Sequence, residues 1–205
     1  MRVRLFSRSL KFVLITAAIL GGGCLGRSPS PTFYALTPVQ DQYVSRRPSP
    51  VKNVVIGIGP VKLAEYLDES LIVTRTSANE LDKAQFHRWA GSFKDNFTNV
   101  LADDIGFLLP TEQIYLYPWR LSVPIDYQVA VDVVRCDGRL GDAAYLEVRW
   151  SIFKGPEKKL LKMTRYSIRE PVTGPGYAAL VAAQSRAVAN LGQEIATAIR
   201  GAGKS

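Results

Sequence analysis

Few residues in this chain of 205 have the chemistry of a catalytic or metal site. His87 is the only histidine, which excludes a His-rich metal site and the HExxH motif. Cys136 could act as a thiol nucleophile, although a single cysteine of this kind is more often a buried hydrophobic residue. Asp103 and Asp104 are neighbours on a predicted helix and cannot face one another, so we interpret both as a solvated surface. The sequence therefore predicts no catalytic residue, no metal and no cofactor.

Lipid chemistry at Cys24 is indicated by the segments that precede it. Residues 1–11 carry four basic side chains and no acidic one, residues 12–20 are apolar or small, and residues 21–23 are all glycine. This order is typical of a signal peptide, since the apolar run is far shorter than the roughly 20 residues that cross a bilayer. The arrangement resembles a bacterial lipoprotein signal, in which the chain is cleaved before Cys24 and the thiol receives diacylglycerol. The alternative is an ordinary secreted protein in which Cys24 has no such role.

Cleavage before Cys24 changes the charge and the thiol content of the chain. The formal charge falls from +8 to +4, because the removed segment holds four basic residues and no acidic one. An exported chain without a basic, aromatic-rich run does not bind nucleic acid. With Cys24 lipidated, only Cys136 keeps a thiol, so no intramolecular disulfide can form. We expect a signal peptide at 1–23, a lipidated cysteine and tether at 24–32, and one domain at 33–205.

Two long amphipathic helices are predicted. From Phe86 to Leu109 apolar residues recur at steps of three and four, and Pro110 ends the pattern. The aromatic stripe of this segment is more often core than ligand site. Residues 176–200 show the same periodicity, and their many alanines permit close approach to a sheet or another subunit. The apolar positions of the second helix are Val181, Val188, Leu191, Ile195 and Ile199.

The remaining periodic segments predict strands. Three of them are expected at 32–39, 54–63 and 114–119. Residues 125–169 alternate between apolar and polar side chains and are divided by two turns, which predicts an antiparallel meander with one buried face. Gly57 and Gly59 are expected to allow another segment to approach the backbone closely. Together the elements predict an α+β fold: a single domain with a mixed or antiparallel sheet packed by two long amphipathic helices.

Several motifs occur together in one order along the chain. They are IGIGPVKLAEYLDESLIVTR at 56–75, HRWAGSFKDNFTNVLADDI at 87–105, YPW at 117–119 and the meander that begins YQVAVDVVRCDG. In this order they resemble the ABC-type transport auxiliary lipoprotein family, over nearly all of the mature chain. Ala64 departs from the family pattern, which typically has proline there.

The resemblance implies a non-catalytic, periplasm-facing lipoprotein that is an auxiliary component of an intermembrane transport system for lipids or other hydrophobic compounds. Its expected partners are an MCE-domain periplasmic protein, which it would dock at the outer membrane, and the inner-membrane transporter of that protein. Leu25 stands where Asp would favour the inner membrane in Gram-negative lipoproteins, so the anchor at Cys24 is expected in outer-membrane lipid. A homo-oligomer is compatible with this role. A periplasmic lipid-binding carrier and a structural envelope lipoprotein are the alternatives.

Residues in or beside loops are candidates for contact with the partner, because exposed aromatic and arginine side chains commonly anchor interfaces. The candidates are Tyr66, Leu67, Arg75, Tyr117 and Trp119. Each of them could equally have a role in core or loop packing.

Overall fold

The structure, a computed structural model, describes residues 29–39, 54–120 and 122–203. The predicted signal peptide, Cys24 and most of the tether therefore lie outside the described residues. The described residues from Pro31 onward belong to one compact unit by their contacts. No helix among the described residues is both long enough and apolar enough to span a membrane.

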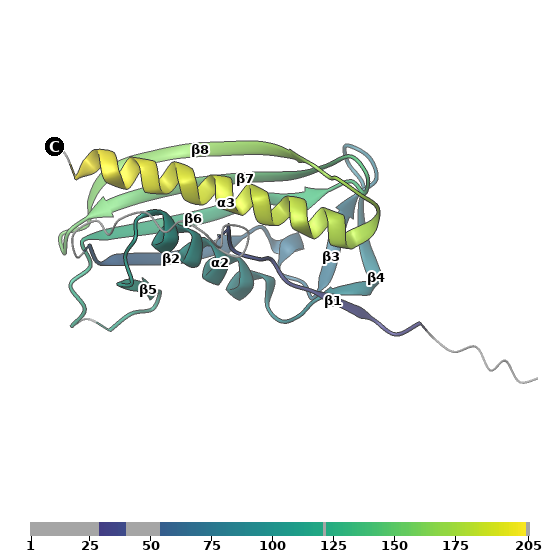
Figure 1. The fold of residues 1–205 in the computed structure, drawn as a ribbon, viewed down its shortest axis with the longest axis horizontal. Coiled ribbons are helices and arrows are strands. Elements are labelled where there is room, and N and C mark those ends of the chain that lie inside the picture. Colours follow the sequence, from purple (N-terminus) through teal and green to yellow (C-terminus); the bar gives the residue numbers. More distant parts are fainter. Residues whose placement is uncertain (1–28, 40–53, 121, 204–205) are drawn as a thin grey trace, which may run out of the picture. The chain divides into compact units, whose positions relative to one another are not determined.

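A five-stranded mixed sheet is the largest element of the fold (Figure 1). In spatial order its strands are β5 (Ile114–Leu116), β2 (Ile56–Leu63), β6 (Tyr127–Gly138), β7 (Ala143–Lys154) and β8 (Lys159–Pro171). The strand β2 is parallel to both β5 and β6, whereas β6, β7 and β8 form the antiparallel meander. The predicted α+β class and the meander are thus confirmed.

One face of this sheet is buried because its apolar side chains alternate with polar ones. On β6, Val129, Val131 and Val133 are buried. On β7, the buried row includes Val148 and Trp150, which pair with Val133 and Val131 across the ladder. The predicted alternation therefore places the apolar row on the core side.

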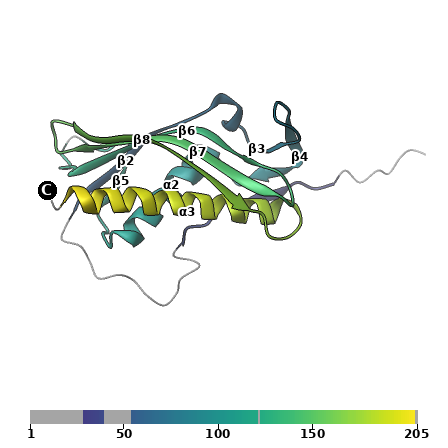
Figure 2. The ribbon, with the colours of Figure 1, turned by 90° about the horizontal axis from the view of Figure 1, so that it is seen from above.

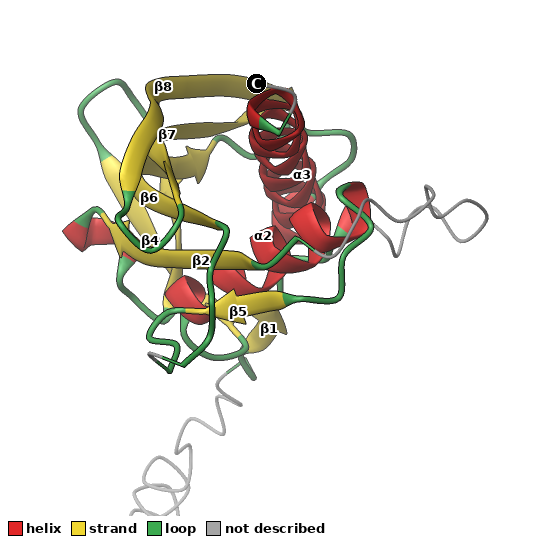
Figure 3. Ribbon diagram, turned by 90° about the vertical axis from the view of Figure 1, so that its left-hand side faces the viewer, coloured by secondary structure: helices red, strands yellow, loops and turns green. Residues whose placement is uncertain are grey.

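Two helices, α2 (Phe93–Leu108) and α3 (Gly176–Ala202), cover the buried face of the sheet (Figure 3). Every apolar position predicted for α3 is buried. The two helices pack closely where a Cβ at Gly192 of α3 would lie 3.1 Å from Cβ of Asp104. Small residues in α3 thus let both helices share the core.

A second sheet of three strands lies beyond the end of β6. It consists of β1 (Thr32–Tyr34), parallel to β4 (Leu81–Trp89), which is antiparallel to β3 (Leu71–Arg75). A short 3-10 helix (Glu65–Leu67) connects β2 to β3. The strand expected at 32–39 is limited to its first three residues.

The predicted helix beginning at Phe86 is wrong in its first turns, because residues 86–89 belong to β4. The helix begins only at Phe93, after Gly91 with a φ of 147° and after Ser92, whose Oγ accepts the Asp95 N–H at 3.2 Å. The apolar spacing misled because Trp89, on the strand, packs against Phe93, on the helix, with ring centroids 4.7 Å apart. One aromatic cluster therefore continues across the break between two elements.

The interpretation of Asp104 as a solvated residue is also wrong. Asp103 is exposed, but Asp104 is fully buried between the helices and the N-terminal segment. Its Oδ1 accepts the backbone N–H of Val39 at 2.6 Å. The side chain thereby ties residues that follow β1 to α2, and adjacent acids on a helix have opposite environments here.

We expect Ser92→Ala to lower the free energy of unfolding by about 1 kcal/mol, because it removes the N-cap of α2. Urea denaturation measures this change. Ser77→Ala, in the exposed β3–β4 turn, is the matched control and should leave stability unchanged. Equal effects of the two substitutions would contradict the assigned cap.

Candidate partner-binding surface

Exposed or half-buried contact candidates lie near the two ends of the sheet face that points away from the helices. Along β6 the outward positions are Gln128, Ala130 and Asp132, followed by Arg135 and Asp137 after an irregularity in the pairing with β7. From Gln128 to Asp137 the strand rises roughly 30 Å. Four of the five candidates divide into one pair near each end and do not form one cluster, and the fifth, Leu67, is buried.

Tyr117 and Trp119 form the first group, in the segment that follows β5. A Cβ at Gly57 would lie 2.8 Å from Cη2 of Trp119, and a Cβ at Gly59 would lie 2.6 Å from Cβ of Tyr117. The predicted close approach at both glycines is thus confirmed. Gln128 Nε2 donates to the Gly59 carbonyl oxygen at 2.9 Å and fixes the strand beneath the aromatic pair.

The aromatic pair presents one ring to solvent and holds it in place with the other. The Tyr117 side chain is 56% exposed, whereas Trp119 is half-buried against Gly57. Their rings meet edge to face with centroids 5.4 Å apart. Such an arrangement restricts the rotamers of Tyr117 before any partner binds, which reduces the entropy lost in binding.

Tyr66 and Arg75 form the second group, around the fully buried carboxylate of Asp137. Arg75 Nη2 donates to Oδ2 at 2.9 Å, Arg135 Nε donates to Oδ1 at 2.8 Å, and the Tyr66 hydroxyl donates to Oδ2 at 3.2 Å. Because Arg75 belongs to β3 and Asp137 to β6, this cluster joins the two sheets.

Burial and the contact with Asp137 keep the Tyr66 phenol and the Arg75 guanidinium protonated. Burial, and then the charge of Asp137, raise the pKa of Tyr66 to about 12, so the phenol stays protonated. The hydrogen bond to Asp137 is the main cause that raises the pKa of Arg75. Leu67 is only 4% exposed and packs in the core. Tyr66, Leu67 and Arg75 are therefore engaged in holding the fold together.

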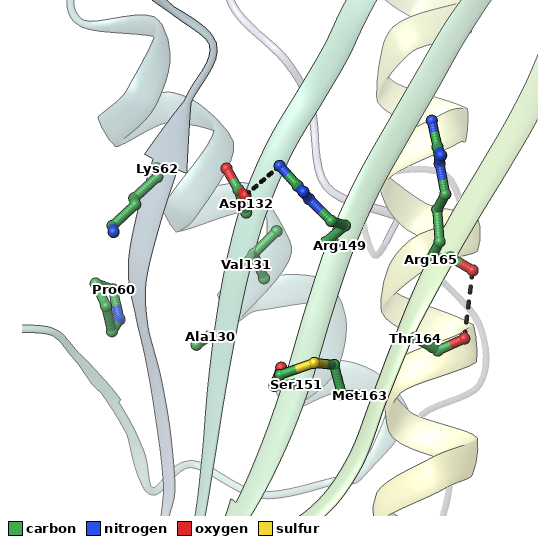
Figure 4. A pocket seen from close by; sticks show the side chains of 10 residues that line it. All are labelled: Pro60, Lys62, Ala130, Val131, Asp132, Arg149, Ser151, Met163, Thr164 and Arg165. Carbon is green, nitrogen blue, oxygen red and sulfur yellow. Dashed lines mark hydrogen bonds and ion pairs between the residues drawn. The ribbon is translucent and has the colours of Figure 1, made fainter.

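An open groove of about 560 Å³ lies on the outward face between the two groups. It is lined by Pro60, Lys62, Ala130, Val131, Asp132, Arg149, Ser151, Met163, Thr164 and Arg165. Figure 4 shows the charged side chains toward one end and Met163 with Ser151 toward the other. Arg149 Nη2 forms an ion pair with Asp132 Oδ2 at 3.0 Å, and Arg165 forms an ion pair with Glu147. Met163 is 68% exposed and offers an adaptable apolar contact.

None of the contact residues predicted from the sequence lines the groove, although the sequence contained a signal for it. Asp132 and Arg149 occupy polar positions of two predicted neighbouring strands, which places them on the outward face. Their pairing across the ladder depends on the register, which one sequence does not determine.

The two residues with catalytic chemistry have structural roles. His87 lies on β4, not on a helix; its Nδ1 is 2.9 Å from the Tyr34 hydroxyl, and its ring stacks on Tyr177 at 3.9 Å. Cys136 is buried within β6, and burial raises the pKa of its thiol to about 12. In the described part of the chain, no group of three or more His, Cys, Asp and Glu residues could hold a metal.

We expect Asp137→Asn to lower the free energy of unfolding by about 2 kcal/mol. The two guanidinium groups lose their buried counter-charge, but they stay partly exposed to water, which limits the cost. Urea denaturation compares it with Asp132→Asn, which breaks an exposed ion pair and should cost less than about 0.5 kcal/mol. If both variants lost the same stability, Asp137 would not join the sheets as described.

We expect the Cys136 thiol of a chain that begins at Leu25 to resist an aromatic disulfide reagent at pH 8, since it is buried and its pKa is raised. The same thiol should react fully in denaturant. Absorbance of the released thiolate measures both states. Rapid reaction of the folded chain would show that Cys136 is accessible.

Comparison with known proteins identifies a family and a fold. The model of the ABC-type transport auxiliary lipoprotein component matches residues 34–196. A crystal structure of an uncharacterized protein is 19% identical with a TM-score of 0.67, and covers 83% of this chain and 99% of its own. A protein of Xanthomonas campestris is 18% identical with a TM-score of 0.66, and covers 85% of this chain and 100% of its own.

Both structural likenesses show that the fold is shared, and the search of curated proteins gave no match. The family model begins within β1 and ends within α3, so it spans both sheets and the helix α2. This chain belongs to the ABC-type transport auxiliary lipoprotein component family, and it is accordingly an auxiliary, membrane-anchored lipoprotein of ABC-type transport.

Proposed function

We propose that this auxiliary lipoprotein is non-catalytic, is anchored in the outer membrane through Cys24, and docks an MCE-domain protein of an intermembrane lipid transport system. The family supplies the auxiliary role in ABC-type transport. The proposal goes beyond the family in three respects: the MCE partner, the lipid cargo and the outer-membrane location.

The anchor is supported by the sequence that precedes the domain. Several acyl chains on Cys24 hold a protein firmly on a bilayer, whereas one chain gives only weak, reversible binding. Leu25 favours the outer membrane over the inner one in Gram-negative lipoproteins, and the short polar segment before β1 acts as a tether.

One observation carries the docking role: the aromatic pair, with Tyr117 exposed, lies at the end of the domain opposite β1. Figures 1 and 2 both place β1 at one end of the described domain and β5 at the other. Because the tether leads into β1, an anchored domain can present Tyr117 and Trp119 away from the membrane. A partner that reaches across the periplasm approaches from that direction.

The chemistry of this end suits a protein partner. Tyr117 is a preorganised aromatic anchor, and aromatic residues and arginine dominate binding energy in protein interfaces. The adjacent groove adds the exposed Met163 and two ion pairs, Arg149 with Asp132 and Arg165 with Glu147, whose charges of both signs can select complementary groups on a partner.

We expect Tyr117→Ala in the full-length, tagged protein to reduce co-purification of an MCE-domain protein about tenfold or more, as for an interface hot spot. Mass spectrometry of proteins recovered from mildly solubilised native envelopes measures the loss. Leu140→Ala removes another exposed apolar side chain, in the β6–β7 turn, and should leave recovery unchanged.

Absence of any MCE-domain protein from preparations of the intact, acylated protein would contradict the docking role. Native mass spectrometry of the same preparation tests the alternative of a lipid carrier. Stoichiometric bound phospholipid, without an MCE-domain protein, would favour that alternative.

A further inference from the structure

The three-stranded sheet exposes two phenylalanines beside an arginine at the end where the tether joins the domain. Phe33 is 59% exposed and Phe86 is 40% exposed, and Arg88 is also exposed. Buried phenylalanine is the usual state, so two exposed rings on one small sheet require an explanation.

The register of the sheet places these side chains on one face. Phe33 of β1 pairs with Arg88 of β4, and Leu71 of β3 also pairs with Arg88. Paired residues in a sheet share a face, and Phe86 lies two residues from Arg88 on the same strand. We call Phe33, Phe86 and Arg88 the outer patch.

The opposite side of β1 and β4 is fixed against the domain. Tyr34 contacts His87, and His87 stacks on Tyr177 at the start of α3. Trp89 packs against Phe93 in the core. With these contacts in place, the sheet cannot turn to bury the outer patch.

The length of the tether limits where the outer patch can lie. Thr32 is the eighth residue after Cys24, so even a fully extended tether spans no more than about 28 Å. An anchored domain therefore stays close to the surface that holds its acyl chains. The tether leads directly into β1, so the sheet formed by β1 and β4 is the part of the domain nearest to the anchor along the chain.

We propose that the outer patch contacts the phospholipid surface of the leaflet in which Cys24 is anchored. Phe33 and Phe86 enter the interfacial region, and the Arg88 guanidinium binds lipid phosphate. Arg88 forms no ion pair with any described carboxylate, so its charge is available there. This inference rests on the proposed lipid anchor and adds a defined orientation of the domain to it.

Fluorescent labelling tests the contact in the full-length, acylated protein reconstituted into vesicles of phosphatidylethanolamine and phosphatidylglycerol. Cysteine is introduced by Phe33→Cys or Phe86→Cys and labelled with an environment-sensitive dye, since Cys136 is buried. Leu160→Cys is the matched control, because Leu160 is similarly exposed but lies near the start of β8, at the end of the domain away from β1. Vesicles with brominated acyl chains quench a dye that reaches the lipid.

We expect brominated lipid to quench the dye at positions 33 and 86 but not at position 160. Arg88→Glu in the Phe33→Cys chain should weaken the quenching, because its charge repels anionic phosphatidylglycerol. Normal thermal unfolding of each variant shows that the fold is retained.

Three outcomes would overturn the inference. Equal, weak quenching at all three positions would show that the outer patch lies in water. A blue-shifted dye that bromine does not quench would show that protein, such as a second copy of this chain, covers the patch. Absence of acyl chains on Cys24 would remove the anchor itself. Retained co-purification of an MCE-domain protein in the first two cases would leave the docking role standing.

Discussion

The one-sided burial of the five-stranded sheet is the constraint on which the rest of the molecule depends. A sheet with one apolar face must cover that face, and α2 and α3 do so with a core that includes Trp150 and Phe97. The close contact at Gly192 allows both helices to fit on the same face. The other face is thereby left for the outward rows of charged and polar residues, the groove and the aromatic pair. Helices on both faces would leave no such surface.

The polar cluster at Asp137 connects this sheet to the smaller one. Its carboxylate accepts from Arg75 of β3 and from Arg135 of β6, so the position of β3 and β4 relative to the groove is fixed by charge as well as by packing. A buried carboxylate between two guanidinium groups gives direction to the contact, which apolar packing alone does not. This connection makes the smaller sheet, which contains β1, and the larger sheet, in which β2 lies beneath Trp119, parts of one body.

Period-two alternation predicted the meander, and the helical spacing of residues 176–200 predicted α3, because both patterns continue without interruption within one element. Helical spacing is misleading between Phe86 and Phe93, because Trp89 continues the spacing although it lies on a strand. It also missed the burial of Asp104, whose partner Val39 is distant in sequence. The candidate contact residues were predicted from their aromatic or arginine type alone. In the structure Tyr66 and Arg75 bind Asp137 within the fold, whereas Tyr117 is exposed. Contacts between distant segments cannot be obtained from local pattern.

We propose that the β5 end of the domain meets the MCE-domain partner while the β1 end stays at the membrane. Photo-cross-linking in living cells tests this most directly, with a photoreactive amino acid placed at position 117 or at position 33. We expect a cross-link to an MCE-domain protein from position 117 and none from position 33. A cross-link to that protein from position 33, with none from position 117, would contradict it.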